Sequence, residues 1–202
     1  TEQYEYAKKA IKEKGLEDQI TIELKDYRDL QGQFDKISSI GMYEAIGIAQ
    51  VPEYLRKVRS LLKPDGIFLN HGITRKGKKK QTKFSSRPEQ KALQKYIFPG
   101  GELDDLGNTI NKMEQAGFDI QDVEGWRMHY QLTTKLWCDR LTANKQAAID
   151  IIGEETYRIW GVYLAGCSLA FLKGSARLYQ TVATQNPKGM PVTPQTREDL
   201  YQ

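Results

Sequence analysis

The sequence predicts an α/β fold with a doubly wound, mostly parallel sheet, and three observations support this prediction. Segment 34–40 carries its hydrophobic residues in an alternating pattern typical of a strand, and the pattern breaks at Gly41. Hydrophobic residues at helical spacing come next and end at 63–66. A second hydrophobic strand then covers 67–70. Two strands joined through a helix form the unit from which parallel sheets are built.

The composition is that of one soluble domain. The 202 residues are enough to bury a core, and a hydrophobic fraction of 39% with a mean hydropathy of −0.62 indicates a wet surface. No hydrophobic run approaches the roughly 18 residues that cross a bilayer. Cys138 and Cys167 fit neither a metal-binding spacing nor a disulfide framework, so we expect a reducing, cytoplasmic location. The two histidines exclude a His-rich site, and no metal is expected.

The first half of the chain is predicted to hold two helices and three strands. A helix over 1–15 is indicated by a hydrophobic face and a terminal glycine (Tyr4, Ala7, Ile11 and Gly15). Alternation predicts a strand over 19–24 (Ile20, Ile22 and Leu24). After the strand over 34–40, an amphipathic helix is indicated by hydrophobic residues at helical spacing (Tyr54, Leu55, Val58, Leu61 and Leu62). A Pro-Asp-Gly turn then leads into the strand that ends on His71.

The second half repeats the alternation. A helix over 103–116, closed by a glycine, precedes a strand over 118–123 and an aromatic-rich connection over 126–130. Two helices and a last strand complete the predicted domain, over about 133–152, 154–172 and 177–183. The polar segment after this domain contains three prolines, which predicts a disordered tail. The domain is therefore expected over 1–185 and the tail over 186–202.

Two predicted strand ends carry groups suited to chemistry. Gly41 breaks the first strand and places Glu44 in a loop, and the other strand ends on His71. Open α/β sheets bind their ligands at the carboxyl ends of the strands. An acid and an imidazole at neighbouring strand ends therefore form a candidate site.

Segment 75–83 carries six lysines or arginines and no acid. One interpretation is a solvated loop. The alternative is contact with an anionic membrane surface, because each basic residue near such a surface contributes about 1 kcal/mol. Nucleic-acid binding is not expected, since no aromatic platform or groove-reading helix accompanies the run.

Eight segments together resemble one enzyme family. In chain order they are TEQYEYAKKAI, LKDYRDL, FDKISSIGMYEAIG, YLRKVRSLLKPDG, FLNHGIT, KYIFPGGEL, MHYQLTTKLW and YRIWGVYLAGCSLAF. They are similar to the cyclopropane-fatty-acyl-phospholipid synthases and mycolic acid cyclopropane synthases, which are S-adenosylmethionine-dependent methyltransferases. The resemblance covers residues 1 to about 185. It implies a class I methyltransferase fold with a Rossmann-like sheet.

The resemblance implies a reaction on lipid. The family methylates a cis double bond of an unsaturated acyl chain in a phospholipid, and removal of a proton from the new methyl group closes a cyclopropane ring. Water has to be excluded, because it would trap the cation. A bound bicarbonate is the base in the family. The residues that match its ligands are the side chains of Glu44, His71 and Tyr130, which we take as catalytic, and the backbone of Ile40 and Ile73.

The resemblance also assigns a cofactor side and an acyl side. S-adenosylmethionine is expected near Gln3, Tyr27, Arg28 and Ile40, with Tyr27 covering the adenine and the Arg28 amide bonding its edge. The acyl tunnel is expected to be walled by Phe98, Tyr163 and Cys167. The implied partners are phospholipid acyl chains and an anionic membrane, with the protein peripheral to its cytoplasmic face.

The chain departs from the family pattern at two residues and in one unmatched part. Ala45 stands where histidine is usual after the glutamate, and Gly72 where threonine is common after the histidine. The first strands and the Gly-rich cofactor loop have no match, so we expect a C-terminal portion of a longer enzyme. The usual strand order of this class is third, second, first, fourth, fifth, seventh, sixth. The unmatched first and second strands lie in the middle of that sheet, so without them the sheet would have a gap between its third and fourth strands. A homodimer, or exchange with the unmatched N-terminal part, would close it.

The expected consequence is little cofactor binding by these 202 residues alone, which calorimetry with S-adenosylmethionine would check. Two alternatives stay open. One is a related lipid or small-molecule methyltransferase that closes no ring. The other is an inactive, truncated remnant that binds lipid.

Overall fold

The computed structural model describes residues 1–77, 88–185, 193, 194, 196 and 198, in two compact units, Thr1–Gly32 and Gln33–Gln202. The first unit contains helix α1 (Glu2–Glu13), as predicted, and one turn of 3₁₀ helix, η1 (Tyr27–Asp29). The prediction of a strand over 19–24 is wrong, since this stretch pairs with no described strand and Leu24 is 68% exposed. Alternation alone does not make a strand, because the backbone groups need a neighbouring strand to bond.

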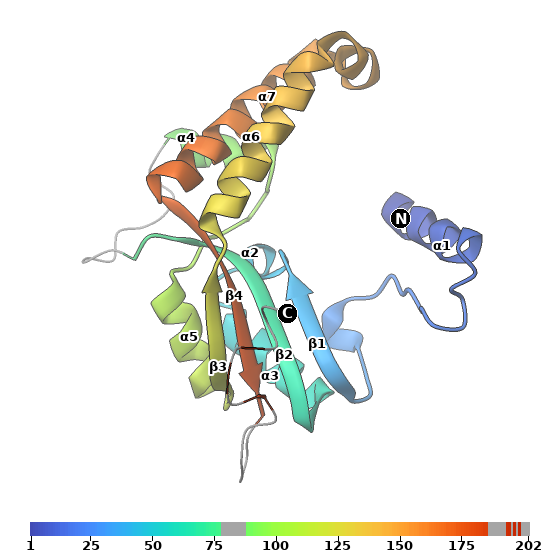
Figure 1. The fold of residues 1–202 in the computed structure, drawn as a ribbon, viewed down its shortest axis with the longest axis vertical. Coiled ribbons are helices and arrows are strands. Elements are labelled where there is room, and N and C mark those ends of the chain that lie inside the picture. The colour runs from blue at the N-terminus through green and yellow to red at the C-terminus, as the bar shows by residue number, and fades with distance from the viewer. Residues whose placement is uncertain (78–87, 186–192, 195, 197, 199–202) are drawn as a thin grey trace. The chain divides into compact units, whose positions relative to one another are not determined.

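A four-stranded sheet is the centre of the second unit (Figure 1). Its strands are β1 (Phe34–Ile40), β2 (Leu62–Arg75), β3 (Asp119–Gly125) and β4 (Ala176–Thr184), in the order β1-β2-β4-β3. β1 and β2 are parallel, whereas β4 is antiparallel to both of its neighbours. Three strands therefore share one direction and β4 opposes them. The order matches the fourth, fifth, seventh and sixth strands of the expected methyltransferase sheet.

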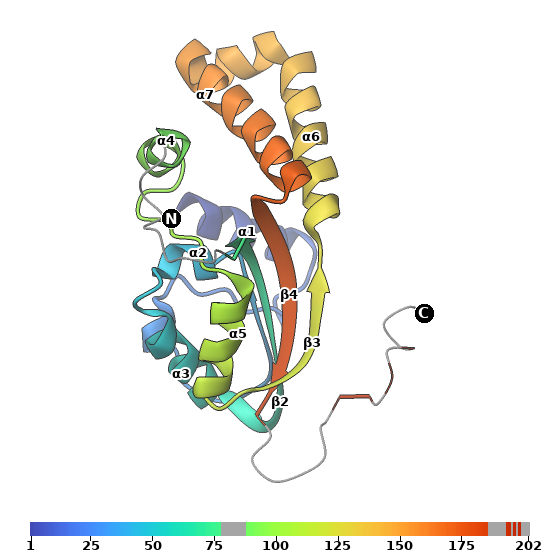
Figure 2. The ribbon, with the colours of Figure 1, turned by 90° about the vertical axis from the view of Figure 1, so that its left-hand side faces the viewer.

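Helices α3 (Val51–Leu61) and α5 (Leu106–Gln115) cover one face of this sheet (Figure 2). Both were predicted. The core between them and the sheet is fully buried, as shown by Leu55, Phe68 and Met113 at 0% exposure. Successive side chains of a strand point to opposite faces. Phe68 points toward α3 and α5, so His71 and Ile73 point to the opposite face of the sheet.

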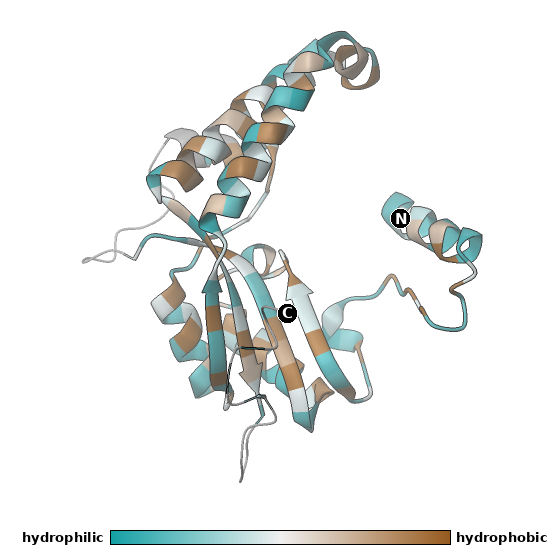
Figure 3. Cartoon of the chain, viewed as in Figure 1, coloured by the Kyte–Doolittle hydropathy of each residue, from teal (hydrophilic) through white to brown (hydrophobic). Residues whose placement is uncertain are grey.

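Helices α6 (Arg127–Ala143) and α7 (Lys145–Lys173) form a hairpin that extends from the end of the sheet (Figures 1 and 2). The predicted boundary at residue 153 is a kink within α7, where Gly153 has a φ of 77°, and the two helices are separated at Asn144 instead. Hydrophobic residues form bands along this hairpin (Figure 3), and several are half exposed: Met128, Leu132, Leu136, Leu169 and Leu172.

Other element boundaries differ from the predictions. The connection expected over 126–130 is the first turn of α6, so Tyr130 is helical. β2 does not end on His71 but continues to Arg75, because β4 pairs with it along that length. The loop expected around Glu44 is a one-turn helix, α2 (Tyr43–Ile46), and a further helix, α4 (Pro88–Tyr96), was not predicted.

Two predictions fall largely on residues outside those described. Residues 78–83 of the basic run are among them, while Arg75 pairs with Asp105 at 3.1 Å. Most of the tail 186–202 is also outside the described part, although the Thr193 hydroxyl donates to Gln121 at 2.9 Å. In the described residues, no helix is long and apolar enough to cross a membrane, and no group of three or more His, Cys, Asp or Glu side chains could hold a metal ion.

Candidate active site

Glu44 is brought to the sheet by a sharp change of direction after β1. Gly41, with a φ of 68°, donates its N–H to the carbonyl of His71 at 2.9 Å, and the chain then enters α2. Glu44 Oε1 accepts a 2.6 Å hydrogen bond from the N–H of Ile73. Glu44 Oε2 is buried and has no hydrogen-bond partner among the described residues. Burial raises the pKa of this carboxyl group, and the bond from Ile73 opposes that rise.

A second carboxylate and a lysine hold the segment that carries Glu44. The backbone N–H of Glu102 donates to the carbonyl of Glu44 at 3.0 Å, and its carboxylate accepts from the N–H of Ile48 at 2.8 Å. Lys112 Nζ donates to the carbonyl of Ile48 at 3.1 Å and pairs with Asp104, which is 1% exposed, at the same distance. Sequence reasoning missed these residues. The only signal was a run of acids directly after the Pro-Gly-Gly turn.

His71 lies on β2 and is 8% exposed. Its Nε2 atom is 2.9 Å from the hydroxyl of Tyr130, and its Nδ1 atom is 3.1 Å from the amide nitrogen of Gln180 on β4. Burial lowers the pKa of His71, so the imidazole is neutral near pH 7. Gln180 was also missed by sequence reasoning, although a glutamine in the middle of a predicted core strand was a usable signal.

Tyr130 reaches the site from the start of α6. Its ring packs edge-on against Phe171 of α7, with centroids 5.6 Å apart, and tilts against His71 at the same separation. Burial raises the pKa of the Tyr130 hydroxyl, and the negative charge of Glu44 adds to the rise. The structure therefore brings together Glu44, His71 and Tyr130, from three separate segments.

The two backbone groups expected in the bicarbonate site are differently placed. Ile40 ends β1 and its side chain is 66% exposed. The N–H of Ile73 already donates to Glu44, so it would contact an anion only by leaving that bond.

The residues expected along the acyl tunnel contact one another. The rings of Phe98 and Tyr163 meet edge-on with centroids 5.9 Å apart, and the ring of Trp160 also meets that of Tyr163 edge-on, with centroids 5.4 Å apart. Cys167 lies one turn beyond Tyr163 on α7, and burial raises the pKa of its thiol. Phe98 is 54% exposed, so this aromatic wall faces open space on one side.

Three of the four expected cofactor residues belong to the first unit. Gln3 lies on α1, and Tyr27 and Arg28 lie in η1. The Arg28 amide, expected to bond the adenine edge, donates to Asp26 at 2.9 Å, and the Arg28 guanidinium pairs with the same carboxylate at 2.7 Å. These bonds lower the pKa of Asp26 to about 2. To bond adenine, the backbone N–H of Arg28 would have to leave the carboxylate of Asp26.

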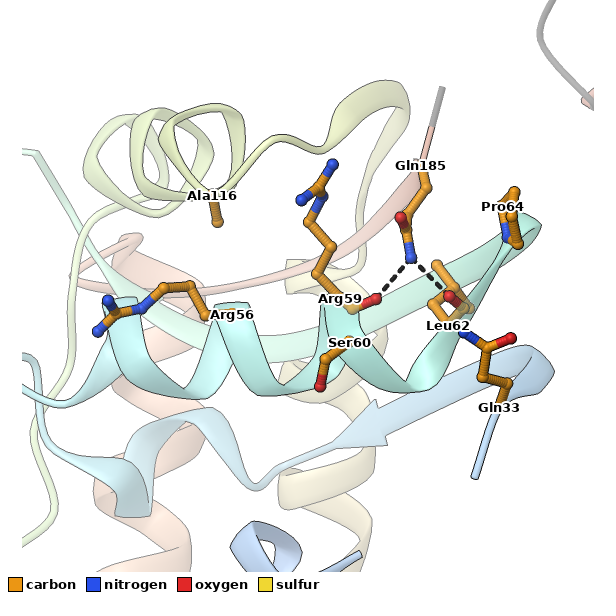
Figure 4. A pocket seen from close by; sticks show the side chains of 8 residues that line it. All are labelled: Gln33, Arg56, Arg59, Ser60, Leu62, Pro64, Ala116 and Gln185. Atoms are coloured by element: carbon orange, nitrogen blue, oxygen red, sulfur yellow. Dashed lines mark hydrogen bonds between the residues drawn. The ribbon is translucent and has the colours of Figure 1, made fainter. Parts of the chain in front are cut away.

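A hollow of about 410 Å³ lies at the amino end of β2, away from the candidate residues (Figure 4). There Gln185 donates to the carbonyls of Arg59 and Leu62 and so caps the end of α3. None of the expected site residues lines it; the lining consists of Gln33, Arg56, Arg59, Ser60, Leu62, Pro64, Ala116 and Gln185. Its arginines point in different directions in Figure 4, and we assign it no role.

The cluster of Glu44, His71 and Tyr130 has the chemistry of a small polar site in apolar surroundings. It offers one carboxylate oxygen without a donor and one hydroxyl that bonds a neutral imidazole. Such a pair can accept one hydrogen bond and donate another to a small group lying between them.

Known proteins resemble this chain over most of its length. A family model described as mycolic acid cyclopropane synthetase matches residues 1–181. A probable fatty acid methyltransferase of Pseudomonas putida is 36% identical over 203 residues, which cover 99% of this chain and 51% of the relative. The cyclopropane-fatty-acyl-phospholipid synthase of Escherichia coli K12 is 36% identical over 163 residues, covering 81% and 41%. The chain thus spans about half the length of the curated relatives it matches.

Solved structures of cyclopropane synthases share the fold of this chain. The cyclopropane synthase MmaA2 of Mycobacterium tuberculosis superposes with a TM-score of 0.80 at 24% identity, covering 91% of this chain and 66% of the other, which supports the fold. The mycolic acid cyclopropane synthase CmaA1, complexed with SAH and CTAB, gives a TM-score of 0.73 at 29% identity and covers 80% and 59%. The predicted resemblance and the class I methyltransferase sheet are confirmed, and the chain belongs to the mycolic acid cyclopropane synthetase family.

Proposed function

We propose that this chain carries the proton-handling part of an S-adenosylmethionine-dependent methyltransferase that acts on unsaturated acyl chains of phospholipids and closes a cyclopropane ring. The observation that supports this most is the contact of His71 with Tyr130 beside the unbonded oxygen of Glu44. S-adenosylmethionine, when bound, supplies a methyl group on a sulfonium, which is electrophilic enough for a double bond to attack. Ring closure then breaks a C–H bond of the new methyl group, and its electron pair forms the ring.

A bicarbonate ion fits the donors and acceptors of the site. Its single O–H can donate to Glu44 Oε2, which lacks a donor, and its remaining oxygens can accept from the Tyr130 hydroxyl. When bound, it would supply the base that takes the proton. The protein's own part is to hold that proton path in place and, through the apolar rings of Tyr130 and Phe171, to keep water away.

The acyl chain is proposed to lie along Phe98, Tyr163 and Cys167. The edge-on pair of Phe98 and Tyr163 presents ring faces that favour a passing positive charge. The lipid is proposed to come from an anionic membrane surface at its cytoplasmic face. The basic residues that follow β2 would contribute to this contact through screened electrostatic attraction.

A second candidate is methyl transfer without ring closure. The observation that favours it is the direct bond from Ile73 to Glu44, which removes one of the backbone donors expected for bicarbonate. Relatives of this chain include proteins named fatty acid methyltransferases as well as cyclopropane synthases.

Lipid analysis after expression of the complete reading frame in a bacterium without cyclopropane lipids separates the candidates. Both a cyclopropane and a methyl-branched alkene are one CH₂ heavier than the unsaturated chain and keep its degree of unsaturation. Proton NMR then distinguishes them, because cyclopropane protons resonate far from alkene protons. We expect ring protons. Alkene protons on the heavier chain would favour the second candidate, and no mass change would contradict both.

Liposome pelleting serves as the control for an inactive lipid-binding protein. Pelleting that persists in the Glu44→Gln variant, without any lipid product from the wild type, would favour that alternative. An active wild type with an inactive Glu44→Gln variant, both pelleting equally, would support the enzyme.

A further inference from the structure

We propose that Gln180 is a positioning residue that fixes the tautomer of His71 and so directs the Tyr130 hydroxyl proton toward the reacting centre. The proposal deepens the proposed function and rests on it for its catalytic meaning, although the tautomer itself is independent of any activity. The side chain of Gln180 bonds His71, and through His71 it acts on Tyr130.

The register of the sheet places the two side chains together. His71 of β2 and Gln180 of β4 are direct partners in the antiparallel ladder, so both side chains project from the same face. Their contact joins the Gln180 amide nitrogen to His71 Nδ1 at 3.1 Å. Gln180 also faces Glu124 of β3 across the next ladder, and Glu124 is exposed.

The direction of hydrogen bonding follows from the donor. In the observed orientation of the Gln180 side chain, the amide nitrogen faces Nδ1 and donates to it, so Nδ1 of the neutral imidazole accepts and the ring proton lies on Nε2. Nε2 then donates to the Tyr130 oxygen at 2.9 Å. The hydrogen of the Tyr130 hydroxyl is therefore not used by His71 and is available to a small anion lying beside the unbonded oxygen of Glu44.

The opposite tautomer would reverse the direction of these hydrogen bonds. With the proton on Nδ1, Nε2 would accept from the Tyr130 hydroxyl, and that hydrogen could no longer be donated to an anion beside Glu44. With the Nε2-bound proton, both ring nitrogens of His71 are bonded and the Tyr130 hydroxyl hydrogen stays available to a group beside Glu44. The groups facing His71 are Gln180 on β4, Tyr130 on α6 and, through Tyr130, the carboxylate of Glu44 on α2.

Nitrogen NMR of the whole chain tests the proposal directly. The chain has only two histidines, so ring-labelled protein gives two sets of signals, and the exposed His129 is an internal control. Proton–nitrogen couplings show which ring nitrogen carries the hydrogen. Near neutral pH we expect the Nε2-protonated form for His71 in the wild type, and again in Tyr130→Phe, because Gln180 still donates there.

Two variants complete the test. In Gln180→Glu a carboxylate accepts from Nδ1, so we expect the His71 signals to shift to the Nδ1-protonated or doubly protonated pattern while the His129 signals stay in place. Gln180→Leu should give a mixture of tautomers. A wild-type imidazole protonated at Nδ1 would overturn the proposal, as would an unchanged His71 pattern in Gln180→Glu. An Nδ1-protonated wild type would overturn the proposal even if a variant does not fold, and the shift in Gln180→Glu is what assigns the tautomer to Gln180.

Lipid products separate this proposal from the proposed function. In the complete reading frame, Gln180→Glu should lower kcat at least tenfold and leave the KM for lipid within twofold, since Gln180 touches no substrate. A normal kcat in Gln180→Glu would contradict the positioning role. A wild type that makes no lipid product, with the Nε2-protonated spectrum, would contradict the proposed function and leave the tautomer assignment supported.

Discussion

The Nε2 atom of His71 lies 2.9 Å from the hydroxyl oxygen of Tyr130, although 59 residues separate them in the chain. One belongs to a strand of the sheet and the other to the helical hairpin that leaves it. Arg127 holds the base of this hairpin together by donating to the carbonyls of Phe171 and Leu172 at 2.7 and 2.9 Å. The contact between His71 and Tyr130 thus joins the sheet to the base of the hairpin, and the following predictions test the cluster around it.

Tyr130→Phe is expected to remove the lipid product while leaving the fold intact. The hydroxyl is the group proposed to pass or orient the proton, and such groups contribute about 10²–10⁴-fold to rate. The lost hydrogen bond costs about 1 kcal/mol of stability. Product formation by the complete reading frame and urea unfolding of the variant measure the two effects. Tyr6→Phe, at a residue 77% exposed, is the matched control, and equal activity in both variants would contradict the assignment.

Glu44→Gln is expected to stabilise the protein relative to the wild type as the pH rises. Burial raises the pKa of Glu44, so the folded state favours the protonated carboxyl group. That contribution is fully present below the ordinary value of 4.5 and is lost as the pH rises through the raised folded value. The variant, which cannot ionise, should gain about 1 kcal/mol over the wild type near neutral pH and nothing in acid.

Urea unfolding at several pH values checks this, with Glu114→Gln on the exposed side of α5 as the control. If Glu44→Gln instead becomes less stable than the wild type as the pH rises, the bond from Ile73 to the ionised carboxylate outweighs the cost of burying its charge.

His71→Gln is expected to make the protein less sensitive to acid. Burial lowers the pKa of His71, so the folded state disfavours the charged imidazole. The wild type should therefore lose stability as the pH falls from the ordinary value of 6.5 toward the lowered folded value, and the variant should lack this loss. Unfolding curves between neutral pH and about pH 5 measure it. His129→Gln should keep the wild-type slope, and the same slope in His71→Gln would refute the prediction.

Lys112→Met is expected to cost about 2–4 kcal/mol, because it leaves the buried carboxylate of Asp104 without its cation and the carbonyl of Ile48 without its donor. Asn108 still donates to both oxygens of Asp104, which keeps the cost below that of an isolated charge. Lys36→Met, at an exposed position of β1, is the control and should change the free energy of unfolding little. A loss below 0.5 kcal/mol in Lys112→Met would show that Ile48 and Asp104 do not need Lys112.

The sequence predicted most elements of the second unit but not all their ends. The helices near 51–61 and 106–115 and the strands near 34–40, 119–125 and 176–184 were foreseen from their hydrophobic patterns. The helices bury their hydrophobic faces against the sheet, whereas in the strand near 34–40 Phe34 and Ile40 stay 43% and 66% exposed. The strand over 19–24 failed, since its pattern is strand-like but no described strand bonds it. Of the site, residue types and motifs indicated Glu44, His71 and Tyr130, and their proximity required coordinates.

The contacts that orient the cluster could not be predicted from a single sequence, although the residue types gave a signal. Gln180 faces His71 only through the ladder register of β2 and β4, and Glu102 reaches Ile48 only through the folding of the segment after α4. Both contacts join residues more than fifty positions apart, and nothing in local spacing indicates them.

The placement of β4 between β2 and β3 has a consequence for biosynthesis. During translation β4 emerges after β2 and β3, the two strands that it joins. Until then β2 and β3 each have an edge whose backbone groups are unpaired. The imidazole receives its amide donor only once residue 180 has left the ribosome. Assembly of the centre is thus a late event in the life of the nascent chain, and pausing before that point would leave two strands exposed to wrong pairing.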